Sequence, residues 1–173
     1  MKIGRLAFLL CTVPSLATAQ SFRVLVTLPG WSRHPMALDT VSTPYEIDAP
    51  ARRVFHEFAN ALDELKVKIT ERDSAGGLVG NAQLQQRHVF AGFPLSKLVG
   101  CGLGATGPNA NSYLVHMALM GFIDSVGPSK TRIRIAFAAG ALDTGGAAKE
   151  PVSCGSTGVL EERLAALVKQ RLR

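Results

Sequence analysis

The sequence is poor in cysteine, in aromatic residues and in charge. It has three cysteines, aromatic residues make up 6% of it and charged residues 18%. It contains no CxxC pair, no HxH or HExxH pattern and no cluster of histidine with cysteine, so the ligand spacings typical of zinc sites are missing. We therefore predict neither a metal site nor a cofactor.

Catalytic motifs are missing as well. There is no GxSxG nucleophile elbow. The neighbouring acids Asp63 and Glu64 fall on a predicted helix, where adjacent side chains splay apart instead of converging. His116 falls in a segment that is apolar on both sides, where a hydrogen-bonded core histidine is expected rather than a catalytic base. We expect no enzymatic activity.

One glycine motif invites a cofactor interpretation. Residues 102–107 match the GxGxxG pattern of dinucleotide-binding loops. In those proteins the loop leads into a helix whose N-terminus faces the phosphates. Here a strand-like segment follows, so we interpret the motif as a tight loop and predict no bound nucleotide.

The N-terminal apolar run is too short to cross a bilayer as a helix. Residues 1–19 begin with the charges of Lys2 and Arg5, continue with about 11 largely apolar residues and end in the small residues ATA. This layout is typical of a secretory signal peptide; an uncleaved anchor is the alternative. We predict an exported chain, periplasmic or extracellular, with no stable membrane span after cleavage.

The charge of the chain is mildly positive. The formal net charge of +6 falls to +4 when Lys2 and Arg5 leave with the signal peptide. The remaining lysines and arginines are scattered and are not interleaved with aromatic residues, so no nucleic-acid partner is predicted.

Two cysteines, Cys101 and Cys154, follow the predicted signal peptide. An even number of cysteines in an exported chain favours a disulfide. Closing a loop of about 54 residues stabilises the fold by roughly 4 kcal/mol in the chain-entropy model. A reactive or metal-binding pair is the alternative, but no ligand cluster accompanies these cysteines.

The apolar spacing predicts one α+β domain over residues 41–173, preceded by an N-terminal arm over 20–40. We expect an antiparallel sheet of about four to six strands with two helices packed on one face, in the order strand, helix, two strands, long loop, two strands, helix. The predicted strands are 41–47, 66–73, 78–90, 112–126 and 131–142, and the helices follow Pro50 and Thr157. Asp48 can cap the first helix or lie at the positive end of its dipole, and Ser156 or Thr157 can cap the second.

The segment 112–126 is apolar on both faces, which is typical of a strand covered on both sides. If the helices cover one face, something else covers the other. The arm can do so through Phe22, Val24, Val26 and Trp31; a second protomer, an envelope partner or an apolar ligand are the alternatives. We favour the arm or self-association.

The stretch EIDAPARRVFHEF, residues 46–58, resembles the opening of START-like, plant-allergen-type helix-grip domains. This resemblance implies a cavity between the sheet and the last helix that holds a small apolar molecule, with Tyr113, His116 and Met117 as wall residues. The element order also resembles small envelope modules of the outer-membrane assembly lipoprotein class, by analogy only.

We therefore expect an exported, non-enzymatic interaction or scaffold module of the cell envelope, which binds an envelope protein or associates with itself. The alternative is a helix-grip binder of a small apolar ligand.

Overall fold

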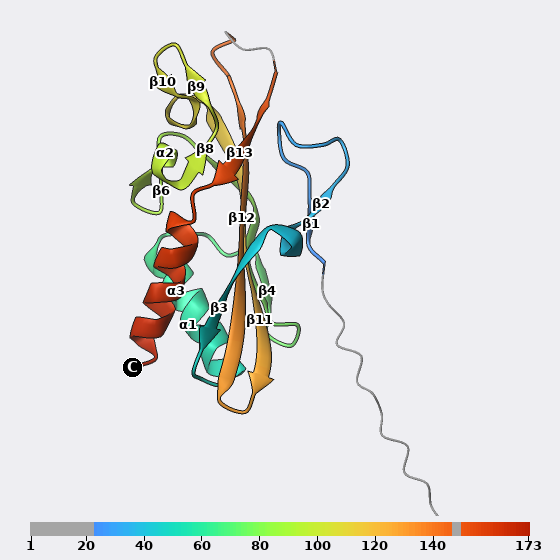
Figure 1. The fold of residues 1–173 in the computed structure, drawn as a ribbon, viewed down its shortest axis with the longest axis vertical. Helices are drawn as coiled ribbons and strands as arrows, with labels where there is room; N and C mark the ends of the chain where they lie inside the picture. Colours follow the sequence, from blue (N-terminus) through green and yellow to red (C-terminus); the bar gives the residue numbers. More distant parts are fainter. Residues whose placement is uncertain (1–22, 147–149) are drawn as a thin grey trace, which may run out of the picture.

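The computed structural model of the protein describes residues 23–146 and 150–173. The predicted signal peptide and Phe22 lie outside the described residues. The elements form an α+β domain built on a mostly antiparallel sheet, which is the predicted class (Figure 1). In chain order they are β1 (Leu25–Val26), β2 (Met36–Ala37), η1 (Leu38–Val41), β3 (Ser42–Ile47), α1 (Ala51–Glu64), β4 (Glu71–Asp73), β5 (Leu78–Gln86), β6 (Val89–Phe90), β7 (Phe93–Pro94), α2 (Leu95–Leu98), β8 (Val99–Gly100), β9 (Leu103–Gly104), β10 (Gly107–Pro108), η2 (Asn109–Asn111), β11 (Leu114–Gly127), β12 (Lys130–Leu142), β13 (Val152–Ser156) and α3 (Val159–Arg171).

The sheet is organised around the long hairpin of β11 and β12. Its strand order is β4-β5-β11-β12-β13-β8. The outer edge of β12 is shared by two strands: β3 pairs with Thr131 to Ala136, and β13 pairs with Ala139 to Ala141. The hairpin runs the length of the molecule, and the other elements pack on its faces or pair with its edges (Figure 1).

The sheet has more strands than predicted, and a third helix is present. Seven strands join the main sheet, and the four-residue helix α2 lies inside the segment predicted as an irregular loop. The additional elements β8 and β13 are two and five residues long. Such short strands show too little alternation to be recognised from spacing.

The apolar stripe of α1 forms as predicted, but the predicted caps are wrong. The N-cap positions are Pro50 for α1 and Gly158 for α3, and neither helix has a side-chain cap. Gly158 has φ 83°, a left-handed conformation that glycine adopts readily. Thr157, expected as a cap, instead donates to carbonyl oxygens at the end of α2.

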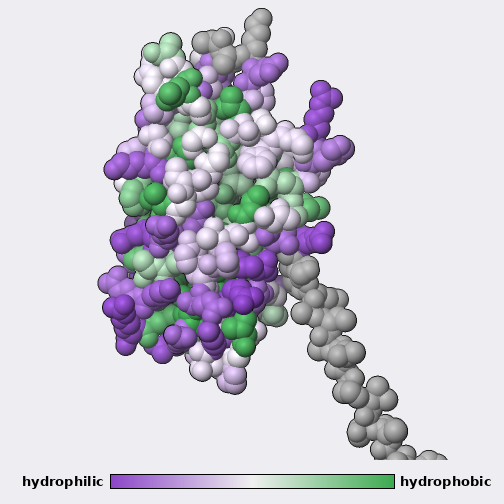
Figure 2. Space-filling model, in the orientation of Figure 1, coloured by the Kyte–Doolittle hydropathy of each residue, from purple (hydrophilic) through white to green (hydrophobic). Residues whose placement is uncertain are grey.

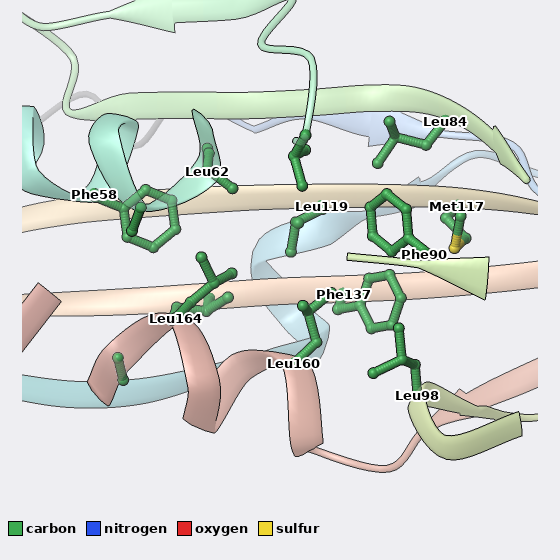
Figure 3. Close-up of a cluster of buried hydrophobic side chains, with 14 of the residues drawn as sticks. Phe58, Leu62, Leu84, Phe90, Leu98, Met117, Leu119, Phe137, Leu160 and Leu164 are labelled. Carbon is green, nitrogen blue, oxygen red and sulfur yellow. The ribbon is translucent and has the colours of Figure 1, made fainter. Parts of the chain in front are cut away.

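The helix-side core lies between α1, α3 and one face of the sheet. Phe58 and Leu62 of α1 meet Leu119 of β11, while Leu160 and Leu164 of α3 approach from the other side (Figure 3). All five side chains are fully buried. Burying a large apolar side chain contributes roughly 1.5–3 kcal/mol, so this layer is the main source of stability.

The N-terminal arm covers the upper part of the opposite face. Val26, Leu28 and Leu38 pack on Met120 and Ala138 of the hairpin in a separate, smaller cluster. The indole Nε1 of Trp31 donates to the carbonyl oxygen of Ala139 at 2.6 Å. The arm is thus one layer of a three-layer structure.

The lower part of this opposite face is closed by charged side chains. Arg134 pairs with Asp124 at 2.9 Å and lies 5.1 Å from the ring centre of Phe122. Lys130 pairs with Glu46 of β3 at 2.6 Å. Both apolar faces of β11 are therefore covered. Helices cover one face, and the arm together with these ion pairs covers the other.

Candidate functional site

The candidate site is the folded segment between β5 and β11, residues 87–113, which we call the loop cap. It contains the hairpins β6–β7 and β9–β10 with α2, β8 and η2, and it lies at the end of the molecule away from the C-terminus (Figure 1). A segment of this length without long elements is unusual in a compact domain and is commonly functional.

The predicted disulfide between Cys101 and Cys154 is confirmed. The two Cα atoms are 4.3 Å apart, and both cysteines are buried. Gly100 pairs with Gly155 where β8 meets β13, so the same antiparallel register places the cysteines opposite each other. The bond thus fixes the centre of the loop cap to the strand that leads into α3.

Asn109 holds the β9–β10 hairpin in place. This buried side chain donates from Nδ2 to the carbonyl oxygen of Cys101 at 3.1 Å, and its backbone N–H donates to the carbonyl oxygen of Gly102. A Cβ atom on Gly104 would lie 2.6 Å from Asn109 Oδ1, so only glycine fits there without a shift. Within the GxGxxG motif, Gly104 thus makes room for the Asn109 side chain, while Gly102 and Gly107 have positive φ angles of 78° and 119°. These roles belong to a tight loop, in line with the sequence-based interpretation.

The apex of the loop cap, the β9–β10 hairpin, is uncharged and carries one exposed apolar side chain. Leu103 is 82% exposed there. No Asp, Glu, Lys or Arg occurs from Leu98 to Ile123. Figure 2 shows the same contrast, with strongly hydrophilic side chains gathered mainly around the helices at the lower end. A side chain that is held in place before binding loses little conformational entropy on contact with another molecule.

The loop cap is joined to α3 at the end of β13. Thr157 donates from Oγ1 to the carbonyl oxygens of Lys97 and Leu98 at 2.7 and 3.0 Å, and its backbone N–H donates to Leu98. One residue earlier, Ser156 pairs with Val99 of β8. The first turn of α3 and the loop cap therefore share one junction.

A buried carboxyl group lies at this junction. Glu161 is only 3% exposed, and Ser156 Oγ donates to its Oε1 at 2.6 Å. Its Oε2 is buried and has no hydrogen-bond partner among the described residues. Burial raises the pKa of Glu161; the hydrogen bonds from Ser156 and from the backbone N–H of Glu161 oppose this, and the nearby charge of Glu162 adds to the rise. Burial, followed by the charges of Glu161 and Glu162, also raises the pKa of Tyr45 on β3.

The sequence places Glu161 in the first turn of the last helix, where the helix dipole favours a negative charge. A sharper signal was present, because Glu161 stands four residues before Ala165 and seven before Val168, both of which are buried. The side chain therefore lies on the apolar stripe of the helix. No comparable signal marked Asn109 or Leu103.

The proposed ligand-wall residues lie on two faces of the sheet. Met117 is fully buried in the helix-side core, and Tyr113 packs against that core. His116, by strand alternation, points to the opposite face, where its neighbours in register are Gln85 and Gly140. Its Nε2 is buried without a partner among the described residues, and burial lowers the pKa of the imidazole.

Other chemistry-bearing groups are few. Within residues 23–146 and 150–173, no three His, Cys, Asp or Glu side chains are grouped so that they can hold a metal ion. An open surface hollow of about 530 Å³ lies over the start of α1, between Pro50, Arg52 and Glu57. No helix among the described residues is long and apolar enough to cross a membrane.

No protein-family model matches the sequence, and no curated protein is significantly similar to it. The function is therefore inferred from the geometry of the loop cap and its junction with α3.

Proposed function

We propose that this chain is an exported, non-enzymatic interaction module of the cell envelope, with the loop cap as its contact surface for a partner protein. The observation that carries the proposal is that the uncharged β9–β10 hairpin is held in a fixed position. Leu103 stands on a hairpin held by Asn109 and by the neighbouring disulfide of Cys101. A contact residue held in place before binding loses little conformational entropy when a partner arrives.

The proposed compartment is supported by the disulfide. Cys101 and Cys154 are bonded and buried, and disulfides of this kind persist mainly in oxidising compartments. The envelope assignment also follows from the analogy in element order to outer-membrane assembly modules.

A binder of a small apolar ligand is the second candidate. The resemblance over residues 46–58 corresponds in the structure to β3 followed by α1, and α3 lies across the same face of the sheet. The space between α3 and the sheet is occupied by core side chains, among them Leu160, Leu164 and Phe137 (Figure 3). That occupancy favours the interaction module.

Two measurements on the chain after its export to a bacterial periplasm test this proposal. Native mass spectrometry should show the oxidised chain without a bound small molecule; a retained apolar ligand would favour the second candidate. Photo-crosslinking from position 103 should then yield one defined protein adduct in the envelope of the source cell. The matched control is Val126, 43% exposed at the far end of the hairpin, which should yield none. Equal labelling from both positions would contradict the proposal.

A further inference from the structure

A buried carboxyl group, that of Glu161, lies at the junction between the loop cap and α3. Within the part of the chain that the structure describes, one of its oxygens is hydrogen-bonded and the other is not. Glu161 Oε1 is held by Ser156, while Oε2 has no partner among the described residues. Buried polar groups are almost always hydrogen-bonded, so an exception in a native fold calls for an explanation.

The two protonation states of Glu161 fit this environment unequally. The neutral acid can donate from Oε1 to Ser156 Oγ over the same 2.6 Å, leaving Oε2 as an uncharged carbonyl oxygen. The ionised form shares its negative charge between both oxygens: the bonds from Ser156 and from the Glu161 backbone N–H stabilise it, but Oε2 is buried and has no hydrogen-bond partner among the described residues. A buried unpaired charge costs far more free energy than a buried unpaired carbonyl.

Among the described residues, no positive side chain contributes to the shift in the pKa of Glu161; α2, which packs on α3, carries Lys97, whose side chain is exposed. On α3 the neighbour is Glu162, and from β3 it is Tyr45. From β13 it is Ser156, and the facing side chains of β12 are apolar. From α1, Glu57 and Glu64 face α3 at its opposite end, where they pair with Arg171. The backbone at the start of α3 is the remaining favourable group for a negative charge.

We propose that Glu161 is a proton-operated latch of the loop cap. When protonated, it holds the first turn of α3 against β13 and the neighbouring β8; when ionised, it loosens this junction. Because Thr157 and the Cys101–Cys154 bond attach the loop cap at the same place, the latch makes the order of the loop cap depend on pH. The dependence of the loop cap on pH does not require the proposed function. Only its consequence, that partner binding would also depend on pH, rests on the proposed function.

The sign of the effect follows from proton linkage. The folded state binds the Glu161 proton more tightly than the unfolded chain does, so stability falls as pH rises from the ordinary carboxyl value of 4.5 through the raised folded value. For any group, each unit by which the folded pKa exceeds the unfolded one corresponds to about a tenfold change in the unfolding equilibrium constant.

The test compares wild type, Glu161→Gln and Glu162→Gln by urea unfolding between about pH 5 and about pH 8. In Glu161→Gln the amide that replaces the carboxyl group is neutral at every pH. Wild type should lose stability as pH rises above the ordinary carboxyl pKa, and this variant should not show that loss. Glu162→Gln removes the same charge one residue away and should keep most of the slope. Equal slopes in wild type and Glu161→Gln would overturn the latch.

Hydrogen exchange separates a latch from a merely buried acid. After correction for intrinsic rates, segments 95–112 and 152–162 of wild type should lose protection at the higher pH, while these segments of Glu161→Gln should not. A Glu161 that titrates without any change in these segments would refute the latch and leave the proposed interaction function standing. If Glu161→Gln fails to fold, carbon-13 titration of the wild-type carboxyl decides: a value at or below the ordinary one overturns the proposal.

Discussion

The two faces of the central sheet are covered in different ways. The helix side is packed by α1, α3 and part of the loop cap, and its core contains the disulfide. The other side is covered by an arm with two-residue strands and by exposed ion pairs. Exposed ion pairs contribute little stability. We infer that the helix side holds the fold together, while the arm side closes an apolar surface that would otherwise be open.

The largest expected effect concerns the disulfide, which lies wholly on the helix side. Replacing Cys101 and Cys154 together by Ala should lower the free energy of unfolding by roughly 4 kcal/mol, because the bond closes a long loop of the unfolded chain. Chemical denaturation measures this loss. The emission of Trp31, the one tryptophan, should not change in the folded double variant. A loss below about 1 kcal/mol would show that the bond adds little to the junction.

A matched pair of methionines compares the two faces directly. Met117 and Met120 lie on the same strand, are both fully buried and belong to the helix-side and arm-side cores respectively. Met117→Ala should cost about 3 kcal/mol and Met120→Ala about 2 kcal/mol, because the arm can settle into the space more easily than packed helices can.

Urea unfolding followed by circular dichroism measures both variants of this pair. If Met120→Ala costs as much as Met117→Ala, the arm is as firmly integrated as the helices, and the proposed difference between the faces disappears. Because the pair shares strand, residue type and burial, backbone effects largely cancel in the comparison.

Much of this asymmetry could be predicted from the sequence, and part of it could not. The stripe of α1 and the alternating hairpin of β11 and β12 are long enough for their periodicity to be unambiguous. The strand predicted over 66–73 shrinks to β4, because Lys66 has φ 59° and redirects the chain after α1. The strand predicted over 78–90 ends at Gln86, because His88 has φ 65°.

The features of the candidate site were harder to predict for a common reason. The contact of Asn109 with Gly104 depends on the conformation of a tight hairpin, and the burial of Glu161 depends on how the first turn of α3 packs. Local spacing reports which face of an element is apolar, but not which partner that face will meet. The disulfide was predictable because only two cysteines follow the predicted signal peptide.

A matched pair of glycines should separate the layers. A Cβ on Gly140 would lie 1.9 Å from the backbone oxygen of Pro29 in the arm, whereas a Cβ on Gly121 would lie 2.5 Å from the ring of Phe58. Gly140→Ala should therefore displace the arm, shift Trp31 emission to the red and cost about 1–3 kcal/mol. Gly121→Ala should cost a similar amount while Trp31 emission stays unchanged. A red shift in both variants would mean that the two layers move together.

The smallest expected effect isolates one hydrogen bond of the arm. Trp31→Phe removes the donation from Nε1 to the carbonyl oxygen of Ala139 but keeps an aromatic ring on the sheet. The loss should be about 1 kcal/mol, the usual net value of a hydrogen bond. It should appear as faster hydrogen exchange in residues 23–38, while α1 and α3 stay protected. Faster exchange in both helices would show that the arm holds the helix side in place, so that neither layer could be treated as independent of the other.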